Sequence, residues 1–442
     1  MDNLNYPLRQ GIGAPAVPCV EVGDRVRRGA LIAGMPPGAL GVPIYSSVTG
    51  RIKEITADSI VIAPEAYGPD YQKLEPADPL DMVRAAGLVG LGGAGFPVWA
   101  KYQHPLPEDG TVIVNAAECE PILTHNIVRI ERKPETVVRG LAIAMELAGA
   151  RHGVIAIKSR HAKAIAALRT AIEHGVPGTT GKNIVLHELR DMYPMGEERA
   201  LVREILGQLL PVTALPSAAG AIISNVETIC RIHEAVDLGK PLIDKDLTVA
   251  GKLEEHPGEI LPLLDLPIGE SVRDILERVG GAVRPDDYGE LLMGGPFTGH
   301  RTTLAEPIVK TTGGLIVTEC FPQGPARIGL LVCACSASEA RMREVAASLG
   351  SEVVGVEYCK QAEPVKQSRK CQNPGICPGQ VAKILALRKA GAEAVLIGNC
   401  TDCSNTVMSC APQLGLPVYH VTDQALRAVN GRLIRRIHEH IA

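Results

Sequence analysis

Hydrophobic positions near the start of the chain come in short runs that glycine interrupts. Between residues 11 and 63, apolar residues cluster at 17–34, 43–55 and 59–64, and most of these runs contain a glycine. Glycine permits the tight hairpins that connect small antiparallel strands. The pattern therefore predicts a small all-β unit at the N-terminus.

The spacing of apolar residues along the chain changes from about residue 76 onward. Apolar, strand-like runs at 111–117, 153–159 and 183–189 alternate with helical stretches at 134–150 and 161–175. Strands that alternate with helices of this length indicate parallel pairing in a doubly wound α/β sheet. In such a sheet we expect the ligand crevice at the carboxyl ends of the strands.

Two further units follow. From about Asp244 the sequence mixes short strands with one helix, as in a small β-grasp-like domain, and from about Arg327 strands and helices alternate again. We therefore expect a multidomain α/β protein whose last unit is a small, cysteine-rich doubly wound α/β domain. The expected domain boundaries are 1–75, 76–243, 244–319 and 320–442.

Composition narrows the function classes. The 442 residues are 46% hydrophobic and 21% charged with a formal net charge of -4, which is ordinary for a globular protein. No strong Lys/Arg cluster favours nucleic acid, and no apolar run is long enough for a membrane span. The N-terminus lacks the pattern of a signal peptide, so we expect a cytoplasmic protein.

The N-terminal unit resembles the barrel-sandwich hybrid fold of biotinyl and lipoyl domains. The resemblance rests on V-x-V-G-D-x-V-x-x-G at 20–29 and on the second S-x-V-x-G half at 46–50. Carrier domains present a modifiable lysine at the exposed turn, whereas residues 45–50 contain none. We therefore expect a structural role for this domain rather than a swinging arm.

A glycine-rich segment opens the second unit. Five glycines fall within residues 87–95, and Lys101 follows shortly after. Glycines let backbone N–H groups approach a phosphate closely at a helix N-terminus, and a lysine adds a cation. The segment predicts a phosphate-binding loop, although a purely structural turn would read the same way.

Further motifs make the resemblance specific. G-L-x-G-x-G-G-A-G-F-P is followed by V-N-A-A-E-C-E-P at 114–121, Y-P-M-G-E-E-R-A-L at 193–201, S-N-V-E-T at 224–228 and M-G-G-P-F-T-G at 293–299. This order resembles the flavin subunit of respiratory complex I and, more closely, the C subunit of the Rnf electron-transport complex. The resemblance covers about residues 10 to 319 and includes the family's SLBB domain at 245–319.

The resemblance implies a Rossmann-like domain that binds FMN and NADH. The residues that it places around the FMN phosphate and ribityl chain are Gly90, Gly92, Gly93, Gly95 and Lys101. Those that it places around the flavin ring and ribityl groups are Asn115, Glu118, Tyr193, Gly196, Glu197, Asn225 and Thr228. Its nicotinamide-nucleotide contacts match Phe96, Glu120 and Glu198. Carboxylates in E-C-E and G-E-E also suit hydrogen bonds from ribose hydroxyls, unless these residues only form a solvated loop.

Cysteines concentrate in the last unit, where nine of the twelve lie after residue 319. Cys333, Cys335, Cys359, Cys400 and Cys403 fall at or just beyond predicted strand ends. Carboxyl ends of adjacent parallel strands converge, so we expect these five residues to form a redox-active constellation. Cys371 and Cys377, just before another predicted helix, could act similarly.

Two chemistries for these cysteines stay open. One is an iron–sulfur cluster held by Cys333, Cys359, Cys400 and Cys403, and the other is a redox disulfide. The C-terminal part of the Rnf protein carries C-x2-C-x2-C-x3-C-P repeats, which are absent from this sequence. The layout loosely resembles the delta iron–sulfur subunit of methyl viologen-reducing hydrogenases.

The whole chain is most similar to the electron-transfer protein associated with D-proline reductase in amino-acid-fermenting anaerobes, because its tail reads G-N-C-T-D-C-S-N-T-V-M. That resemblance implies an NADH-dependent oxidoreductase that passes electrons through FMN to the C-terminal cysteines and on to a partner reductase within a protein complex. Two alternatives stay open: a subunit that works only inside an Rnf- or complex I-like assembly, and a non-redox scaffold with a vestigial flavin pocket.

Overall fold

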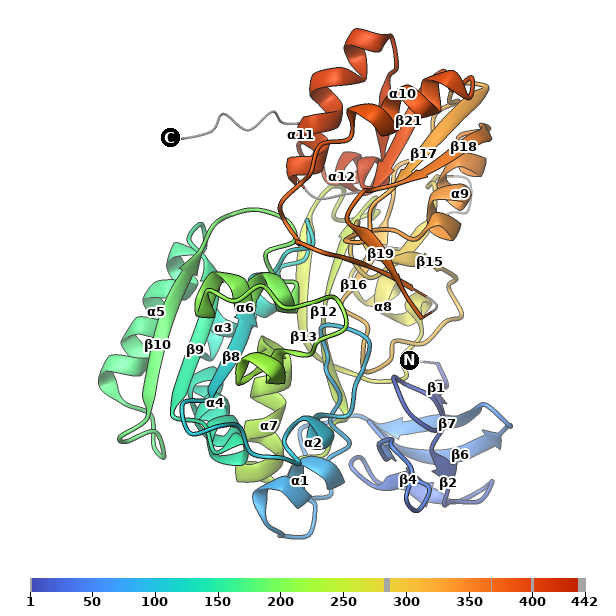
Figure 1. The fold of residues 1–442 in the computed structure, drawn as a ribbon. Coiled ribbons are helices and arrows are strands. Elements are labelled where there is room, and N and C mark those ends of the chain that lie inside the picture. Colours follow the sequence, from blue (N-terminus) through green and yellow to red (C-terminus); the bar gives the residue numbers. More distant parts are fainter. Residues whose placement is uncertain (1, 282–286, 367, 399–400, 436–442) are drawn as a thin grey trace.

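The computed structural model describes residues 2–281, 287–366, 368–398 and 401–435, without the side chains of 401–405. Figure 1 shows the mixed sheet, in yellow, between a green α/β unit on one side and the orange and red C-terminal unit above. None of the helices in these ranges has the length and apolar character needed to cross a membrane.

The N-terminal unit consists of two small antiparallel sheets around one core. Their strand orders are β1-β7-β6-β3 and β2-β4-β5. The strands are β1 (Leu4–Pro7), β2 (Val17–Pro18), β3 (Arg25–Val26), β4 (Leu31–Gly34), β5 (Ile44–Tyr45), β6 (Thr49–Ile55) and β7 (Ser59–Ala66). Alternating apolar residues such as Ile52, Ile60 and Ile62 fill the space between the sheets.

The second unit is a four-stranded parallel sheet in the order β10-β9-β8-β11, covered by helices on both faces. Its strands are β8 (Thr111–Ala116), β9 (His152–Lys158), β10 (Asn183–Leu189) and β11 (Ala221–Asn225). Its helices are α1 (Pro79–Ala85), α2 (Val98–Lys101), α3 (His125–Arg132), α4 (Pro134–Ala148), α5 (Ala162–His174), α6 (Glu198–Leu206) and α7 (Val226–Leu238), with a short 3-10 turn at Pro216–Ala219. This arrangement agrees with the doubly wound sheet that the sequence predicts.

A mixed five-stranded sheet in the order β13-β12-β16-β14-β15 follows. Its elements are β12 (Asp244–Gly251), β13 (Ile260–Pro267), α8 (Val272–Arg278), β14 (Leu291–Met293), β15 (His300–Thr302) and β16 (Gly314–Val317). Helix α8 packs Val272, Ile275 and Leu276 against the sheet.

A buried ionic network joins this mixed sheet to the parallel sheet unit. Asp246 on β12 accepts hydrogen bonds from Arg129 of α3 at 2.5 Å and from Arg231 of α7 at 3.1 Å. All three side chains are almost completely shielded from solvent. Because the charges are paired and buried, this contact fixes the two units relative to each other.

The C-terminal unit is a parallel sheet in the order β18-β17-β21-β22. Its elements are β17 (Arg327–Val332), α9 (Glu339–Ser348), β18 (Glu352–Tyr358), β19 (Ala362–Val365), β20 (Ser368–Cys371), α10 (Val381–Lys389), β21 (Ala394–Gly398), α11 (Thr401–Cys410), a 3-10 turn at Pro412–Leu414, β22 (Val418–His420) and α12 (Asp423–Ala428). Strands β19 and β20 form a separate hairpin between β18 and α10.

Candidate functional site

The parallel sheet reverses its direction of growth between β8 and β11. β9 and β10 follow β8 on one side, whereas β11 pairs with the other side. Asn115 and Asn225 are register partners at the carboxyl ends of these two strands. Ligands of open α/β sheets bind at such a topological switch point, so two predicted site residues lie where the fold offers a crevice.

The glycine-rich loop lies against the N-terminus of α7. Asn225 caps this helix by accepting hydrogen bonds from the backbone N–H groups of Glu227 and Thr228. The Thr228 hydroxyl in turn accepts a hydrogen bond from the backbone N–H of Leu91 at 3.0 Å. A loop held over a helix N-terminus suits an anionic ligand, because the backbone N–H groups of the loop and of the helix N-terminus carry partial positive charge.

The predicted glycines differ in how much room the protein leaves for a side chain at each position. A Cβ on Gly95, whose φ is +71°, would lie 2.7 Å from Gly11 Cα, and a Cβ on Gly92 would lie 2.8 Å from Asn225 Nδ2. A Cβ on Gly93 would have no heavy atom within 4 Å, and one on Gly90 would have only the Phe96 carbonyl oxygen, at 3.9 Å. Packing within the protein therefore explains Gly92 and Gly95 but not Gly90 or Gly93.

Lys101 and Glu198 lie near the same crevice. The Lys101 ammonium donates to the Ile223 carbonyl of β11 at 3.0 Å and lies 3.6 Å from a Glu198 oxygen. Glu198 is exposed at the first turn of α6. Lys101 therefore provides a partly exposed cation at the sheet edge, with a solvent-facing carboxylate beside it.

Two predicted segments, 115–120 and 193–198, are bound to each other. The Asn115 amide donates to the Gly196 carbonyl at 2.8 Å, and the Gly196 N–H donates to the Cys119 sulfur at 2.9 Å. Glu118 has a positive φ of 37° and accepts a hydrogen bond from the Asn126 N–H. These contacts hold the loop after β8 in one defined conformation at the crevice.

Glu197 is occupied by a helix cap. Its carboxylate accepts hydrogen bonds from the backbone N–H groups of Arg199 and Ala200 at 2.8 and 3.0 Å. It also binds the Arg199 guanidinium. The side chain that the resemblance assigns to the flavin therefore already satisfies the N-terminus of α6.

Glu120, expected as a nucleotide contact, instead binds the G-G-P-F-T-G turn. Its carboxylate accepts from the backbone N–H of Phe297 at 2.8 Å and from the backbone N–H and hydroxyl of Thr298. A Cβ on Gly295 would lie 2.3 Å from this side chain. Burial raises the pKa of Glu120 to about 7, although the hydrogen bonds from Thr298 and Phe297 oppose this.

Tyr193 connects the crevice to the C-terminal unit. Its ring stacks on Phe297 with a centroid distance of 3.8 Å, and its hydroxyl donates to the Cys335 carbonyl at 2.5 Å. Cys119 packs against this aromatic pair, and so do Cys335 and Cys377 of the C-terminal unit. Sulfur-bearing residues of both units thus meet at the Tyr193–Phe297 stack.

The structure brings together three of the five predicted cysteines. The Cys333 side chain raises the pKa of both Cys335 and Cys359, so these three residues lie close together. Cys371, at the end of β20, also lies near this group, because Cys335 lowers its pKa. Strand ends predict the first three, whereas Cys371 is placed there by the β19–β20 hairpin, which no pattern in the sequence signals.

Cys400 lies outside the described residues, as does the side chain of Cys403. The expected iron–sulfur ligand set of Cys333, Cys359, Cys400 and Cys403 therefore stays a prediction. Among the side chains that are described, no group of three or more His, Cys, Asp or Glu residues is arranged to hold a metal ion.

The thiols of this group differ in acidity. Hydrogen bonding to Cys333, then to Cys371, together with burial, raises the pKa of Cys335 well above its usual value. The hydrogen bond with Cys335, helped by the Asn373 backbone N–H, lowers the pKa of Cys371. Cys371 is therefore the more acidic thiol of this pair.

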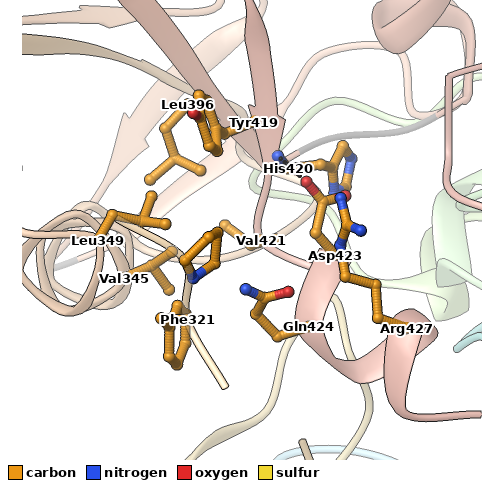
Figure 2. A pocket seen from close by; sticks show the side chains of 11 residues that line it. Phe321, Val345, Leu349, Leu396, Tyr419, His420, Val421, Asp423, Gln424 and Arg427 are labelled. Atoms are coloured by element: carbon orange, nitrogen blue, oxygen red, sulfur yellow. Dashed lines mark hydrogen bonds between the residues drawn. The ribbon is translucent and has the colours of Figure 1, made fainter. Parts of the chain in front are cut away.

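A small pocket of the C-terminal unit lies elsewhere, between α9, β22 and α12 (Figure 2). Val345, Leu349 and Tyr419 contribute to its apolar wall, and Asp423 and Gln424 to its polar end. No residue that the sequence predicts for the site lines this pocket.

Two family models match the chain. The RnfC barrel sandwich hybrid domain matches residues 1–66, and the Nuo51 FMN-binding domain matches residues 83–234. These matches confirm the expected N-terminal barrel-sandwich domain and the FMN-binding type of the α/β unit.

Relatives agree with these matches. The chain is 34% identical over 331 residues to the C subunit of the ion-translocating oxidoreductase complex of Pseudomonas aeruginosa, an alignment that covers 70% of this chain and 41% of that protein. It is 32% identical to the C subunit of the proton-translocating ferredoxin:NAD(+) oxidoreductase complex of Clostridium ljungdahlii, covering 71% and 70%. It is 33% identical to cobalamin reductase PduS of Citrobacter freundii, covering 80% and 72%. The chain therefore belongs to the RnfC family.

Proposed function

We propose that this protein is an NADH-dependent flavoprotein that passes electrons from FMN to its C-terminal cysteines and on to a partner reductase. The single observation that carries the proposal is the glycine loop, which lies over the N-terminus of α7 at the switch point between β8 and β11. The family matches and the oxidoreductase names of the relatives support the same chemistry.

The residues at the crevice fit FMN. The exposed backbone at Gly92, Gly93 and Ala94 and the Lys101 ammonium offer hydrogen-bond donors and positive charge for a phosphate. We assign the polar groups of Asn115 and Asn225, at the adjoining strand ends, to the ribityl chain and flavin ring. When bound, FMN accepts two electrons together and releases them singly or as a pair.

NADH would approach from the solvent side. Glu198 is exposed beside Lys101 and can accept hydrogen bonds from ribose hydroxyls, and Phe96 is half-buried at the same loop. Glu120 is assigned a different part: it holds the Phe297 turn and thereby positions the Phe297 ring against Tyr193.

The proposed electron acceptor is a partner reductase. The relatives include subunits of Rnf complexes and a cobalamin reductase, so a role inside a multi-protein redox complex has support from the family. The proline reductase partner and a cytoplasmic location stay predictions. The proposed domain boundaries stay those of the sequence, with the mixed sheet as the SLBB β-grasp domain and the last unit as the redox domain.

Substitution of Gly93 tests the cofactor site most sharply. Gly93→Ala has room in the cofactor-free protein, so it should leave the apo protein's melting temperature unchanged. If the FMN phosphate lies against this backbone, the added methyl group should weaken FMN binding about tenfold or more, or at least about 1.4 kcal/mol. Flavin fluorescence titration measures this affinity.

Gly68→Ala is the matched control, because its Cβ also meets no heavy atom within 4 Å. It should leave both the melting temperature and FMN affinity unchanged. Wild-type FMN affinity in Gly93→Ala would contradict the site, and absence of FMN binding by the wild-type protein would favour the non-redox scaffold.

A further inference from the structure

Lys310 is a buried lysine that binds backbone rather than a counter-charge. It lies between β15 and β16 of the mixed sheet and is almost completely shielded from solvent. Its Nζ donates hydrogen bonds to the Pro43 carbonyl at 2.8 Å and to the Gly87 carbonyl at 2.9 Å. In the ranges that the structure describes, this amine forms no ion pair, and burial lowers its pKa to about 7.

Three units of the protein meet at this amine. Pro43 directly precedes β5 of the N-terminal barrel-sandwich domain, and Gly87 opens the glycine loop of the FMN-type unit. The backbone N–H of Lys310 also donates to the Gln10 side chain at 3.1 Å. Lys310 therefore joins the mixed sheet and the N-terminal domain to the start of the glycine loop.

The same contacts explain why residue 87 is a glycine. Its φ is +72°, and a Cβ there would lie 2.6 Å from the Pro43 carbonyl oxygen and 3.1 Å from Lys310 Nζ. A side chain would thus push away both the lysine and the N-terminal domain. The first glycine of the loop serves its support from behind.

The far end of the loop is held in a similar way. The Ile12 N–H donates to the Gly95 carbonyl at 3.1 Å. A Cβ on Gly95 would lie 2.7 Å from Gly11 Cα and 2.9 Å from Thr311 Cγ2, the residue after Lys310. Segments 11–12 and 310–311 therefore hold the last glycine as well as the first.

Between these two supports the loop stays open. Leu91 donates to the Thr228 hydroxyl, but within the described part of the chain the N–H groups of Gly92, Gly93 and Ala94 have no acceptor. A Cβ on Gly93 would meet no heavy atom within 4 Å. A backbone segment that is fixed at both ends and keeps free donors in its middle suits a bound phosphate.

The buried amine is costly unless its hydrogen bonds are needed. Transfer of an amine out of water is unfavourable, but an apolar side chain at 310 would leave two buried carbonyls without donors. Even the neutral amine has two N–H groups, so it can bind both carbonyls on either side of its pKa.

We propose that Lys310 is a positioning residue for FMN: through the Gly87 carbonyl, and together with segment 11–12, it holds the glycine loop in the shape that receives the phosphate. This inference rests on the proposed function, because it assigns a support to the proposed FMN site. Lys101 would contact the phosphate itself, whereas Lys310 acts only through the loop backbone.

Comparison of FMN with riboflavin separates this role from a merely structural one. Riboflavin has the same ring and ribityl chain but no phosphate, so only FMN binding should depend on the shape of the loop. Flavin fluorescence titration of the full-length apoprotein gives both dissociation constants. Their ratio measures how much the protein gains from the phosphate.

Lys310→Met keeps the length of the side chain and removes both hydrogen bonds. We expect a lower melting temperature, since two buried carbonyls lose their donor. We also expect FMN affinity to fall about tenfold or more, with riboflavin affinity nearly unchanged. The preference for FMN over riboflavin should fall by the same factor.

Thr318→Val is the matched control for lost stability. Thr318 is a buried residue of the same mixed-sheet unit, and its hydroxyl makes two hydrogen bonds to the backbone of Glu290, at 3.0 and 3.2 Å. Its replacement should lower the melting temperature but keep the wild-type preference for FMN.

Gly11→Ala tests the other support and keeps the inference testable if Lys310→Met folds poorly. The added Cβ would lie 2.4 Å from the Gly95 carbonyl oxygen, so the end of the loop must shift, and the preference for FMN should fall. Gly23→Ala is its control, because Gly23 also has a positive φ in the N-terminal domain but its Cβ would meet no heavy atom within 4 Å. It should keep the wild-type preference.

Two results would overturn the inference. One is a wild-type preference for FMN in folded Lys310→Met, or in Gly11→Ala if the first variant does not fold. The other is an equal loss of FMN and riboflavin affinity, which is what general damage to the fold would produce. Failure of the proposed function looks different, because the wild-type protein itself would then bind no FMN.

Discussion

The Tyr193 hydroxyl donates a 2.5 Å hydrogen bond to the Cys335 carbonyl, so a residue that borders the proposed flavin crevice directly contacts a cysteine of the C-terminal unit. Tyr193→Phe removes this bond but keeps the stack on Phe297. We expect a loss of about 0.5–1.5 kcal/mol of stability. We also expect slower electron transfer to the C-terminal thiols, measured by rapid mixing with NADH followed by acid quench and alkylation.

Tyr67→Phe is the control for this prediction, because the Tyr67 hydroxyl donates to the Asp265 carbonyl of β13 rather than to a cysteine of the C-terminal unit. It should not change the rate at which thiols appear. Equal rates in Tyr193→Phe and the wild type would show that the contact has no part in transfer.

Glu198→Gln should retain FMN yet react more slowly with NADH. Glu198 is exposed, and its carboxylate lies 3.6 Å from the Lys101 ammonium, on the solvent side of the crevice. The neutral amide accepts weaker hydrogen bonds from ribose hydroxyls, which we expect to raise the NADH concentration needed for half-maximal reduction about tenfold. Stopped-flow bleaching of the flavin measures this, and an unchanged concentration dependence would remove Glu198 from the nucleotide site.

Asp246→Asn should destabilise the junction between the FMN-type unit and the mixed sheet. Asp246 pairs with Arg129 and Arg231 in the protein interior, so its replacement leaves these two buried guanidinium groups with one carboxylate fewer and with Asp265 as the partner that they still share. We expect a loss of about 3–5 kcal/mol in urea unfolding. Glu188→Gln, which breaks the exposed pair with Arg169, should cost at most about 1 kcal/mol. Similar losses in both variants would contradict a structural role for the network.

The carboxyl group of Glu120 should make stability depend on pH. Its pKa in the folded protein is about 7, above the usual 4.5, so the folded state binds the proton more tightly than the unfolded state. Its stabilising contribution is therefore complete below pH 4.5 and is lost as pH rises through about 7, a change of about 3 kcal/mol. Glu120→Gln should flatten this part of the melting-temperature profile between about pH 5 and 8. An identical slope in both proteins would assign the titration elsewhere.

The spacing of apolar residues and the positions of strand ends predict the parallel sheets and some of the residues at their carboxyl ends. The alternation of apolar runs and helices predicted the parallel sheet, and strand ends correctly brought Cys333 near Cys359. The glycine loop was located from its composition, and its position over α7 agrees with a phosphate-binding role.

Long-range contacts could not be predicted in the same way. Cys371 lies near Cys335 because of the β19–β20 hairpin, whose short strands carry no clear alternation. Glu120 lies in a motif expected to contact a nucleotide, but a turn 177 residues further along the chain takes both of its oxygens. Asp246 meets Arg129 across 117 residues, and no spacing in the sequence signals such a contact.

An anaerobic NADH titration of the oxidised, FMN-loaded protein tests the central claim most directly, because it counts electrons. If the C-terminal cysteines accept electrons from the flavin, more than one equivalent of NADH per FMN will be consumed, and the excess will appear as new thiols in that unit. Alkylation and mass spectrometry of the quenched samples locate these thiols. Complete flavin reduction by a single equivalent, with neither new thiols nor any other reduced centre, would contradict the account.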